Sequence, residues 1–196
     1  MEIQGRRRTD APTHREAARG LGTQAELWET AVGEARAPAP DAPGGGIARF
    51  DYFLSEPDTT NNRMALRSAI VALDRVAARG AADIRFVTDS NYIVLGMTEW
   101  VAAWRSRGWR RKGGAIENLD LWQALAERAA GRRITWRWVR GHAGHVKNEY
   151  ANDLATRAAA EQTASGGLVP SGFALWLAAE RARGRYAQFD PDADFR

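Results

Sequence analysis

The sequence predicts an α/β domain, a sheet with helical cover, and two observations support this prediction. Between residues 47 and 160, short segments rich in β-branched and aromatic residues alternate with longer segments. In the longer segments, apolar residues recur every three or four positions, which is the spacing of an amphipathic helix. In sheets of this kind chemistry gathers at the carboxyl ends of the strands, so the residues that follow each predicted strand are the first candidates for a functional site.

The elements follow in order from these patterns. Strand-like composition and alternation predict strands at residues 47–55, 83–88 and 134–139. Helical spacing, with glycine near several of the expected ends, predicts helices at residues 64–78, 91–105, 118–130 and 148–162. Asp89 and His142 come shortly after two of the predicted strands, so we expect both at the carboxyl edge of the sheet.

The flanking segments read differently. Residues 14–36 have loosely helical spacing, and APAPDAPGGG at residues 37–46 is typical of a linker or a turn-rich loop. After the last predicted helix, Phe173, Trp176 and Leu177 predict a short amphipathic helix. We therefore divide the chain into a divergent N-terminal segment at 1–46, a domain at 47–162 and a C-terminal extension at 163–196.

Composition excludes several classes of protein. The chain is 44% hydrophobic, enough for one core in 196 residues, so a wholly disordered chain is excluded. It has no cysteine, which excludes a disulfide scaffold, thiolate zinc and a cysteine nucleophile. No stretch approaches 18 apolar residues and the N-terminus is charged, so we expect no membrane span, no signal peptide and a cytoplasmic location.

Charge is concentrated in one segment. The net charge is +4 and the sequence pI is about 9.9, which is a weak hint of a polyanionic partner. The sharper signal is RSRGWRRK at residues 105–112, which holds five positive charges, no negative charge and a tryptophan. A run of charge is usually a solvated face, but cations around a tryptophan favour nucleic-acid binding.

Five sequence blocks stand in a recognisable order. They are TTNNRM at 59–64, VTDSNY at 87–92, GMTEWVAAWRSRGWRRK at 96–112, NLDLW at 118–122 and WRWVRGHAGHVKNEYANDLA at 136–155. In these blocks the chain resembles type 1 ribonuclease H over about residues 47–160. The resemblance implies a mixed sheet of about five strands flanked by helices. It also implies a hydrolase, an endonuclease that cleaves the RNA strand of RNA–DNA hybrids with two Mg²⁺ ions; Mn²⁺ is an alternative.

The carboxylates depart from the family pattern, which has four of them. Asp89 matches the third, but Ala65 stands at the glutamate position and Asn152 at the last aspartate. Asp10 is the candidate for the first, although the glycine and small-residue loop expected after it is missing. The predicted metal ligands are therefore Asp89, Asp10 and Asn152, and because Mg²⁺ prefers carboxylate oxygens we expect weak metal binding and a weak enzyme.

The predicted catalytic residues are Asp89, His142, Asn152 and Asp10. The resemblance gives His142 the role of a mobile acid/base, whereas a lone histidine in a loop is more often a surface residue. Asp89 has a competing interpretation as a turn residue or helix N-cap. We expect His145 to be structural, capping the loop.

The resemblance also places a set of residues on the nucleic acid. They are Thr60, Asn61, Asn62, Asn91, Trp100, Trp104, Arg105, Arg107, Trp109, Arg110, Arg111, Lys112 and Asn118. Arginine pairs with phosphate, an indole ring packs on sugar or base, and amides both donate and accept hydrogen bonds. Packing in the core is the competing interpretation for the tryptophans, and ordinary turn chemistry is the competing one for Asn61.

Two functions remain open from the sequence. The first is an active or weakly active hybrid nuclease. The second is a catalytically impaired module that binds RNA–DNA hybrid or a related duplex without cleaving it. Nothing in the C-terminal extension identifies a protein partner, although a scaffold that docks a protein there is a further alternative.

Overall fold

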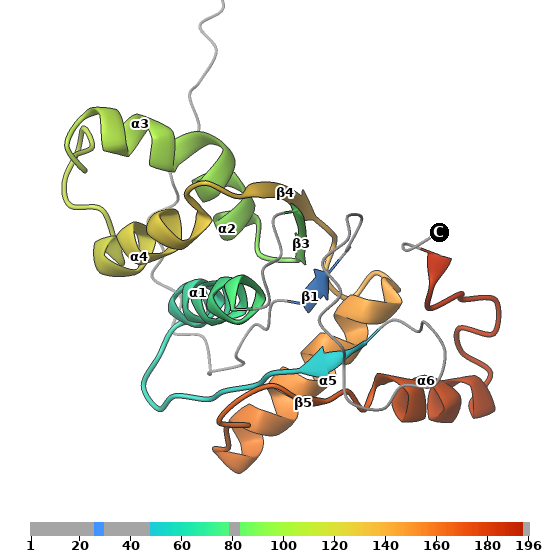
Figure 1. Cartoon of the computed structure of the whole chain (residues 1–196). Coiled ribbons are helices and arrows are strands. Elements are labelled where there is room, and N and C mark those ends of the chain that lie inside the picture. The colour runs from blue at the N-terminus through green and yellow to red at the C-terminus, as the bar shows by residue number, and fades with distance from the viewer. Residues whose placement is uncertain (1–25, 30–47, 79–82, 194–196) are drawn as a thin grey trace, which may run out of the picture.

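The computed structural model describes residues 26–29, 48–78 and 83–193 (Figure 1). The strands are β1 (Glu26–Glu29), β2 (Phe50–Asp51), β3 (Asp83–Thr88), β4 (Arg133–Trp138) and β5 (Val169–Pro170). The helices are α1 (Asn61–Ala77), α2 (Asn91–Leu95), the π-helical turn η1 (Gly96–Trp100), α3 (Val101–Ser106), α4 (Leu119–Ala129), α5 (Val146–Glu161) and α6 (Phe173–Ala182). None of the described helices is long and apolar enough to cross a bilayer.

The central sheet is mixed, as predicted. β3 and β4 pair in parallel, and the helices between them form the crossover that parallel neighbours require. β1 pairs antiparallel with β3, so the order in this sheet is β1-β3-β4. In the described residues the five strands are divided, because β2 and β5 form a separate two-stranded sheet.

Two predicted elements differ from the structure for the same reason, namely long-range strand pairing. The strand predicted at 47–55 is only two residues long, because Phe50 and Asp51 pair with β5 in the C-terminal extension rather than with the central sheet. Its partner strand contains Pro170, which has no N–H to extend the ladder. The helix predicted at 14–36 is wrong at Glu26–Glu29, where pairing with β3 overrides the loose helical spacing, and the rest of that segment lies outside the described residues.

The main core lies between β3–β4 and the helices α1 to α4. Ile84 and Phe86 of β3 pack with the apolar face of α1, which includes Leu66 and Leu73, and all four side chains are buried. Trp122 of α4 is the largest fully buried side chain. The helices predicted at 64–78, 91–105, 118–130 and 148–162 and the strands predicted at 83–88 and 134–139 are confirmed to within a few residues.

Gly96 is required where the second predicted helix passes Trp122. An ideal Cβ built on Gly96 would lie 1.8 Å from Cη2 of Trp122, so no larger residue fits without moving the indole ring. The π-helical turn η1 begins at this glycine. The close approach lets Trp100, Trp104 and Tyr92 pack around the same ring, with centroid separations of 5.0–6.4 Å from Trp122.

The C-terminal extension packs on α5 and forms a second core (Figure 1). Tyr150 of α5 and Phe173 of α6 have ring centroids 5.3 Å apart, and Val146 and Leu177 are buried beside them. The predicted amphipathic helix is therefore confirmed as α6. Its apolar residues are buried because they contact α5, not the central sheet.

A buried carboxylate joins this second core to β2. Asp51 accepts hydrogen bonds from the Tyr150 hydroxyl, from Ser171 Oγ at 2.7 Å and from the backbone N–H of Gly172 at 2.9 Å. Burial, and then the hydrogen bond to Asp51, raises the pKa of Tyr150 far above its usual range. Three donors therefore satisfy one buried carboxylate and connect β2, α5 and the start of α6.

Substituting Gly96→Ala should destabilise the fold by about 1–3 kcal/mol, because the added methyl overpacks the core against Trp122. Chemical denaturation measures the effect. Gly167→Ala is the matched control, since an added Cβ there meets nothing within 4 Å. Equal stability of the two variants would contradict the packing described for Trp122.

Substituting Asp51→Asn should cost about 1–3 kcal/mol of unfolding free energy, because an amide nitrogen then faces buried donors. The variant should also change the alkaline limb of the stability curve. Above pH 10, the ordinary tyrosine pKa, the unfolded chain releases the Tyr150 proton while the folded chain keeps it, so wild-type stability falls as pH rises.

Without the Asp51 charge that fall should be smaller, which urea titrations at several pH values measure. Asp58→Asn is the control, because Asp58 is exposed and its φ of 51° is one that asparagine adopts readily. An Asp51→Asn variant as stable as this control would show that the carboxylate does not hold the extension.

Candidate active site

β3 and β4 end side by side, and this edge carries Asp89. The N–H of Val139, the residue after β4, donates to the carbonyl of Thr88, the last residue of β3, at 3.0 Å. Thr88 is buried, and its Oγ1 accepts a hydrogen bond from the N–H of Ser90 at 3.0 Å. The prediction that Asp89 lies at the carboxyl end of a strand is confirmed, and hydrogen bonds fix the chain on both sides of it.

The carboxylate of Asp89 is not used as a helix cap. Ser90 is the N-cap of α2, and its side chain accepts from the N–H of Ile93. The Asp89 side chain instead rests on Gly141, where an ideal Cβ would lie 2.9 Å from Asp89 Oδ2. The backbone carbonyl of Asp89 accepts a hydrogen bond from Trp138 Nε1 at 3.0 Å. The competing interpretation as an N-cap is therefore wrong, and the carboxylate lies at the edge of the sheet against Gly141.

The loop that follows β4 carries His142 directly after Gly141, the glycine that the Asp89 side chain rests on. His142 is exposed and has a left-handed φ of 53°, which is uncommon for a residue other than glycine. Its Nδ1 lies 4.0 Å from Oε2 of Glu149 in α5, and Oε1 of Glu149 accepts from the N–H of Gly144 at 3.3 Å. Glu149 therefore holds the histidine loop to the first turn of α5.

His145 has the structural role that the sequence predicted. It is the N-cap of α5, and its Nδ1 accepts from the N–H of Asn148 at 3.3 Å. This hydrogen bond satisfies one of the free donors of the first helical turn. The helix that carries Asn152 therefore begins at a fixed point directly after the His142 loop.

The other predicted ligand positions are depleted. Ala65 is 5% exposed and packs in the main core, so it offers no donor. Asn152 is half-buried on α5, and its neighbour Asp153 is bound elsewhere, because Trp176 Nε1 donates to Asp153 Oδ2 at 2.7 Å. One residue along a helix turns a side chain by about 100°, so Asp153 cannot take the place of Asn152. Asp10 lies outside the described residues.

These donors do not by themselves make a two-ion site. Within residues 48–78 and 83–193, no three side chains of histidine, aspartate or glutamate gather closely enough to hold a metal ion. A pair of hard cations about 4 Å apart needs several carboxylates. Of the predicted carboxylate ligands, Asp89 is the one that lies in the described part of the chain.

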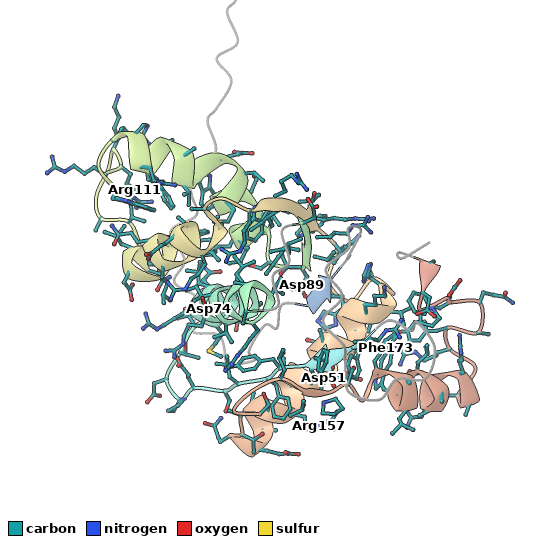
Figure 2. The ribbon with its side chains drawn as sticks, viewed as in Figure 1. Asp51, Asp74, Asp89, Arg111, Arg157 and Phe173 are labelled. Atoms are coloured by element: carbon teal, nitrogen blue, oxygen red, sulfur yellow. The ribbon has the colours of Figure 1, made fainter. Side chains whose placement is uncertain are left out.

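The basic protrusion, defined as residues 105–112, covers the last two residues of α3 and part of the loop to α4, far from Asp89 in the view of Figure 2, where Arg111 is labelled. Left-handed residues Gly108 (φ 63°) and Trp109 (φ 60°) turn the chain, and Arg111 bridges to Gly114. The exposed cations are Arg105, Arg107, Arg110 and Lys112. A solvent-facing cluster of one sign is suited to a polyanion.

The tryptophans near this protrusion contribute unequally. Trp104 is 8% exposed and belongs to the main core, so packing accounts for it. Trp100 and Trp109 are partly buried against the same core. Part of each indole ring is exposed to solvent, and the predicted contact of both residues with nucleic acid stays a prediction.

The predicted polar contacts all lie at the N-terminal ends of helices. Thr60 is the N-cap of α1 and accepts from the N–H of Arg63 at 3.2 Å, while Asn61 and Asn62 begin that helix. Asn91 begins α2 and is exposed, and Asn118 is the N-cap of α4 with a φ of 53°. The Thr60 hydroxyl is explained by its role as a helix cap. The asparagine side chains lie at helix N-termini, where backbone N–H groups of the first turn also face outward.

Sequence reasoning missed three residues of the site, namely Trp138, Gly141 and Glu149. The first two contact Asp89, and the third holds the His142 loop. The position of Trp138 at the end of a strand was a usable signal, because it places the indole near the residue that follows the neighbouring strand. Nothing in the sequence distinguishes Glu149 from other helical glutamates.

The chain is similar to known proteins in sequence and in fold. The RNase H family model matches residues 45–160. The chain is 50% identical over 115 residues to ribonuclease H of Pseudomonas paraeruginosa, covering 58% of this chain and 76% of that protein. It is 44% identical over 117 residues to ribonuclease H of Acidithiobacillus ferrooxidans, covering 59% and 72%.

A solved structure is similar in fold over most of both chains. It is the crystal structure of LC9-RNase H1, described as a type 1 RNase H with the type 2 active-site motif. The sequence identity is 44% and the TM-score is 0.68, with 96% of this chain and 93% of that chain covered.

Proposed function

Because the chain belongs to the ribonuclease H family, we propose that it is an endonuclease that hydrolyses the RNA strand of RNA–DNA hybrids. The observation that carries the proposal is the position of Asp89. Its carboxylate lies at the end of β3, against the glycine that precedes His142. A carboxylate and a histidine on adjacent strand ends are suited to binding and proton transfer at one phosphate.

Each residue of this edge has a proposed role. Asp89 orients the reacting groups at the scissile phosphate, and hydrogen bonds on both sides hold its backbone in place. His142 moves a proton, and Glu149 orients its loop. The exposure of His142 leaves room for the loop to approach a bound hybrid.

Ribonucleases H use divalent metal ions, and Mg²⁺, with Mn²⁺ as the alternative, is our proposal for this chain. The described donors do not fit a two-ion site, so metal binding is weak in this proposal. The metal-ligand roles of Asn152 and Asp10 also remain proposals. The cytoplasmic location remains a prediction from the sequence.

The basic protrusion is the proposed handle for the hybrid. Arg105, Arg107, Arg110 and Lys112 are exposed, and Trp100 and Trp109 pack at their base. Contacts of this kind read the sugar–phosphate backbone and the shape of the duplex, not its sequence. Substrate binding is therefore provided by a surface distinct from the depleted metal site.

A specific observation also favours the second function, a binding module without activity. Ala65 is a core residue, and no three metal-binding side chains gather within residues 48–78 and 83–193, while the cationic surface is intact. LC9-RNase H1, however, is described as a type 1 enzyme with the type 2 active-site motif. A relative at this similarity therefore differs in its active-site motif and is still described as an RNase H, which supports the nuclease.

Substituting Asp89→Asn should abolish cleavage of an RNA–DNA hybrid, because it removes the carboxylate that the structure places at the end of β3 against Gly141. Single-turnover cleavage of a labelled hybrid in Mg²⁺ and in Mn²⁺ is the measurement. The wild type should be slow and faster in Mn²⁺, because Mn²⁺ binds a given set of ligands more tightly. Activity that survives Asp89→Asn would indicate a contaminating nuclease and overturn the site.

Restoring two charges separates the nuclease from the binding module. The double variant Ala65→Glu, Asn152→Asp should cleave faster than the wild type, because two negative charges return to the metal site. The single variant Ala65→Gln is the control, because it places a side chain of similar size but no charge at the same buried position. Tight hybrid binding without wild-type cleavage, and activity only in the restored variant, would assign the binding module. Thermal melting of each variant confirms that it folds.

Reversing Arg110→Glu and Arg111→Glu together should weaken hybrid binding for every sequence and lower the slope of log K against log salt by about 1 for each phosphate that the variant no longer neutralises. Fluorescence anisotropy over a range of salt concentrations measures both. The matched control reverses Arg75 and Arg157, which are exposed on α1 and α5. If both pairs have the same effect, net charge and not the basic protrusion determines binding.

A further inference from the structure

The second core begins at the first residue of α5. Val146 directly follows residues 139–145, the loop that carries His142, and it is 6% exposed because it packs in this core with residues of α6. The other α5 residues in the second core are Tyr150 and Leu154, so all three lie within the first three turns of the helix. The C-terminal extension therefore packs on the end of α5 that adjoins the proposed active site.

Trp176 of α6 adds a directed contact to this packing. Its ring is stacked on the rings of Phe173 and Tyr186, with centroid separations of 6.0 and 5.9 Å and interplanar angles of 22° and 26°. Stacking orients the indole, and Nε1 donates a hydrogen bond to Asp153 Oδ2 at 2.7 Å. A hydrogen bond to a carboxylate is stronger than one between neutral groups, so Trp176 holds the side of α5 that carries Asp153.

Glu149 lies on the same side of the helix. It comes four residues before Asp153, so the two side chains are neighbours along α5. The Glu149 side chain is 17% exposed and meets the loop twice, 4.0 Å from Nδ1 of His142 and 3.3 Å from the backbone nitrogen of Gly144, which donates to it. The contact of α6 with Asp153 is thus one helical turn away from the contacts that hold the loop.

Arg185 brings a second group of the extension to this side of α5. Its guanidinium donates to the Tyr186 hydroxyl and forms an ion pair with Glu180 Oε2 at 2.7 Å, so it is held just after the end of α6. The hydrogen bond to Tyr186 raises the pKa of Arg185, and the charges of Glu180 and Glu149 add to the rise. Because such charge effects weaken with distance, Glu149 has a cation of the extension near it as well as His142.

The loop has a conformation that needs contacts of this kind. His142 is not a glycine, yet its φ is 53°, and its side chain is 75% exposed. A left-handed residue of this type persists where the surrounding structure holds it. A group that transfers a proton must also lie within hydrogen-bond reach of the reacting atom, so a small displacement of the loop would lower the rate.

We propose that the C-terminal extension positions the loop that carries His142, with Trp176 and Arg185 as the positioning residues. Trp176 acts through Asp153, one turn along α5. Arg185 acts on Glu149 directly, and Glu149 holds the loop. The inference deepens the proposed function and rests on it for the role of His142 in proton transfer.

The experiment uses the full chain, three variants and one control. Trp176→Phe keeps an aromatic ring and removes the N–H donor, whereas Asp153→Leu removes the acceptor. Arg185→Gln removes the cation. Arg183→Gln is the matched control, because Arg183 is exposed and pairs with the same carboxylate, that of Glu180.

Three measurements are made on each variant. Exchange of the Gly144 amide with water, followed by NMR, reports on the loop whether or not the protein is active. Single-turnover cleavage at saturating hybrid is measured with His142 present and in a His142→Ala background. Affinity for the hybrid is measured separately in EDTA over a range of salt concentrations.

All three variants should release the loop, and the control should not. Amide exchange at Gly144 should become faster, because its hydrogen bond to Glu149 is loosened. Cleavage should slow at least about five-fold, a part of the roughly 10²–10⁴-fold that a positioned acid/base contributes. Affinity and salt slope should stay at the wild-type values.

Two combinations show whether the positioning residues act through the proposed route. In the His142→Ala background, Trp176→Phe and Arg185→Gln should slow cleavage no further, because the group that they position is absent. Combining Trp176→Phe with Asp153→Leu should be no slower than either change alone, because both break one hydrogen bond.

Other outcomes would overturn the proposal. Unchanged exchange at Gly144 would show that the extension does not hold the loop, and equal slowing with and without His142 would show that it only supports the fold. A salt slope lowered by about 1 in Arg185→Gln and not in Arg183→Gln would make Arg185 a phosphate contact instead. An inactive wild type would refute the proposed nuclease, while Gly144 exchange would still decide whether the extension positions the loop; thermal melting shows that each variant folds.

Discussion

The parallel pairing of β3 and β4 is the constraint on which the site depends. Their register matches Thr88 with Trp138, so both strands end at the same level and the next residues meet. The hydrogen bond from Val139 to Thr88 continues the pairing by one step, after which the chain turns through Gly141. A slip of one residue would turn every side chain of β4 to the opposite face and carry Trp138 away from Asp89. The apolar core shared by the two strands, α1 and α4 opposes such a slip, so packing fixes the strand ends and the strand ends fix the polar residues.

The surface suited to binding nucleic acid is more complete in this chain than the metal site. Four of the five cations of the basic protrusion are exposed, whereas two of the metal-site positions hold an alanine and an asparagine. Asp153, the nearest substitute carboxylate, is held by Trp176 in the C-terminal extension. Helix geometry turns Asp153 away from the direction of Asn152, and the extension occupies its carboxylate through Trp176.

Local pattern determined much of the fold. The apolar spacing of α1, α4 and α5 and the compositions of β3 and β4 predicted these elements within a few residues, because each buries one continuous face. Sequence blocks also placed Asp89 after a strand and assigned His145 to a cap. These features depend on residues that are close together in the chain.

Only the tertiary structure decided the rest, because the contacts join distant segments. Asp51 meets Tyr150 across about half the chain, and β2 takes its partner from the C-terminal extension. The register of β3 and β4 brings Trp138 to Asp89, and burial separates Trp104 from the binding surface. Sequence spacing carries no record of such pairings, since they follow from how packed elements share one core.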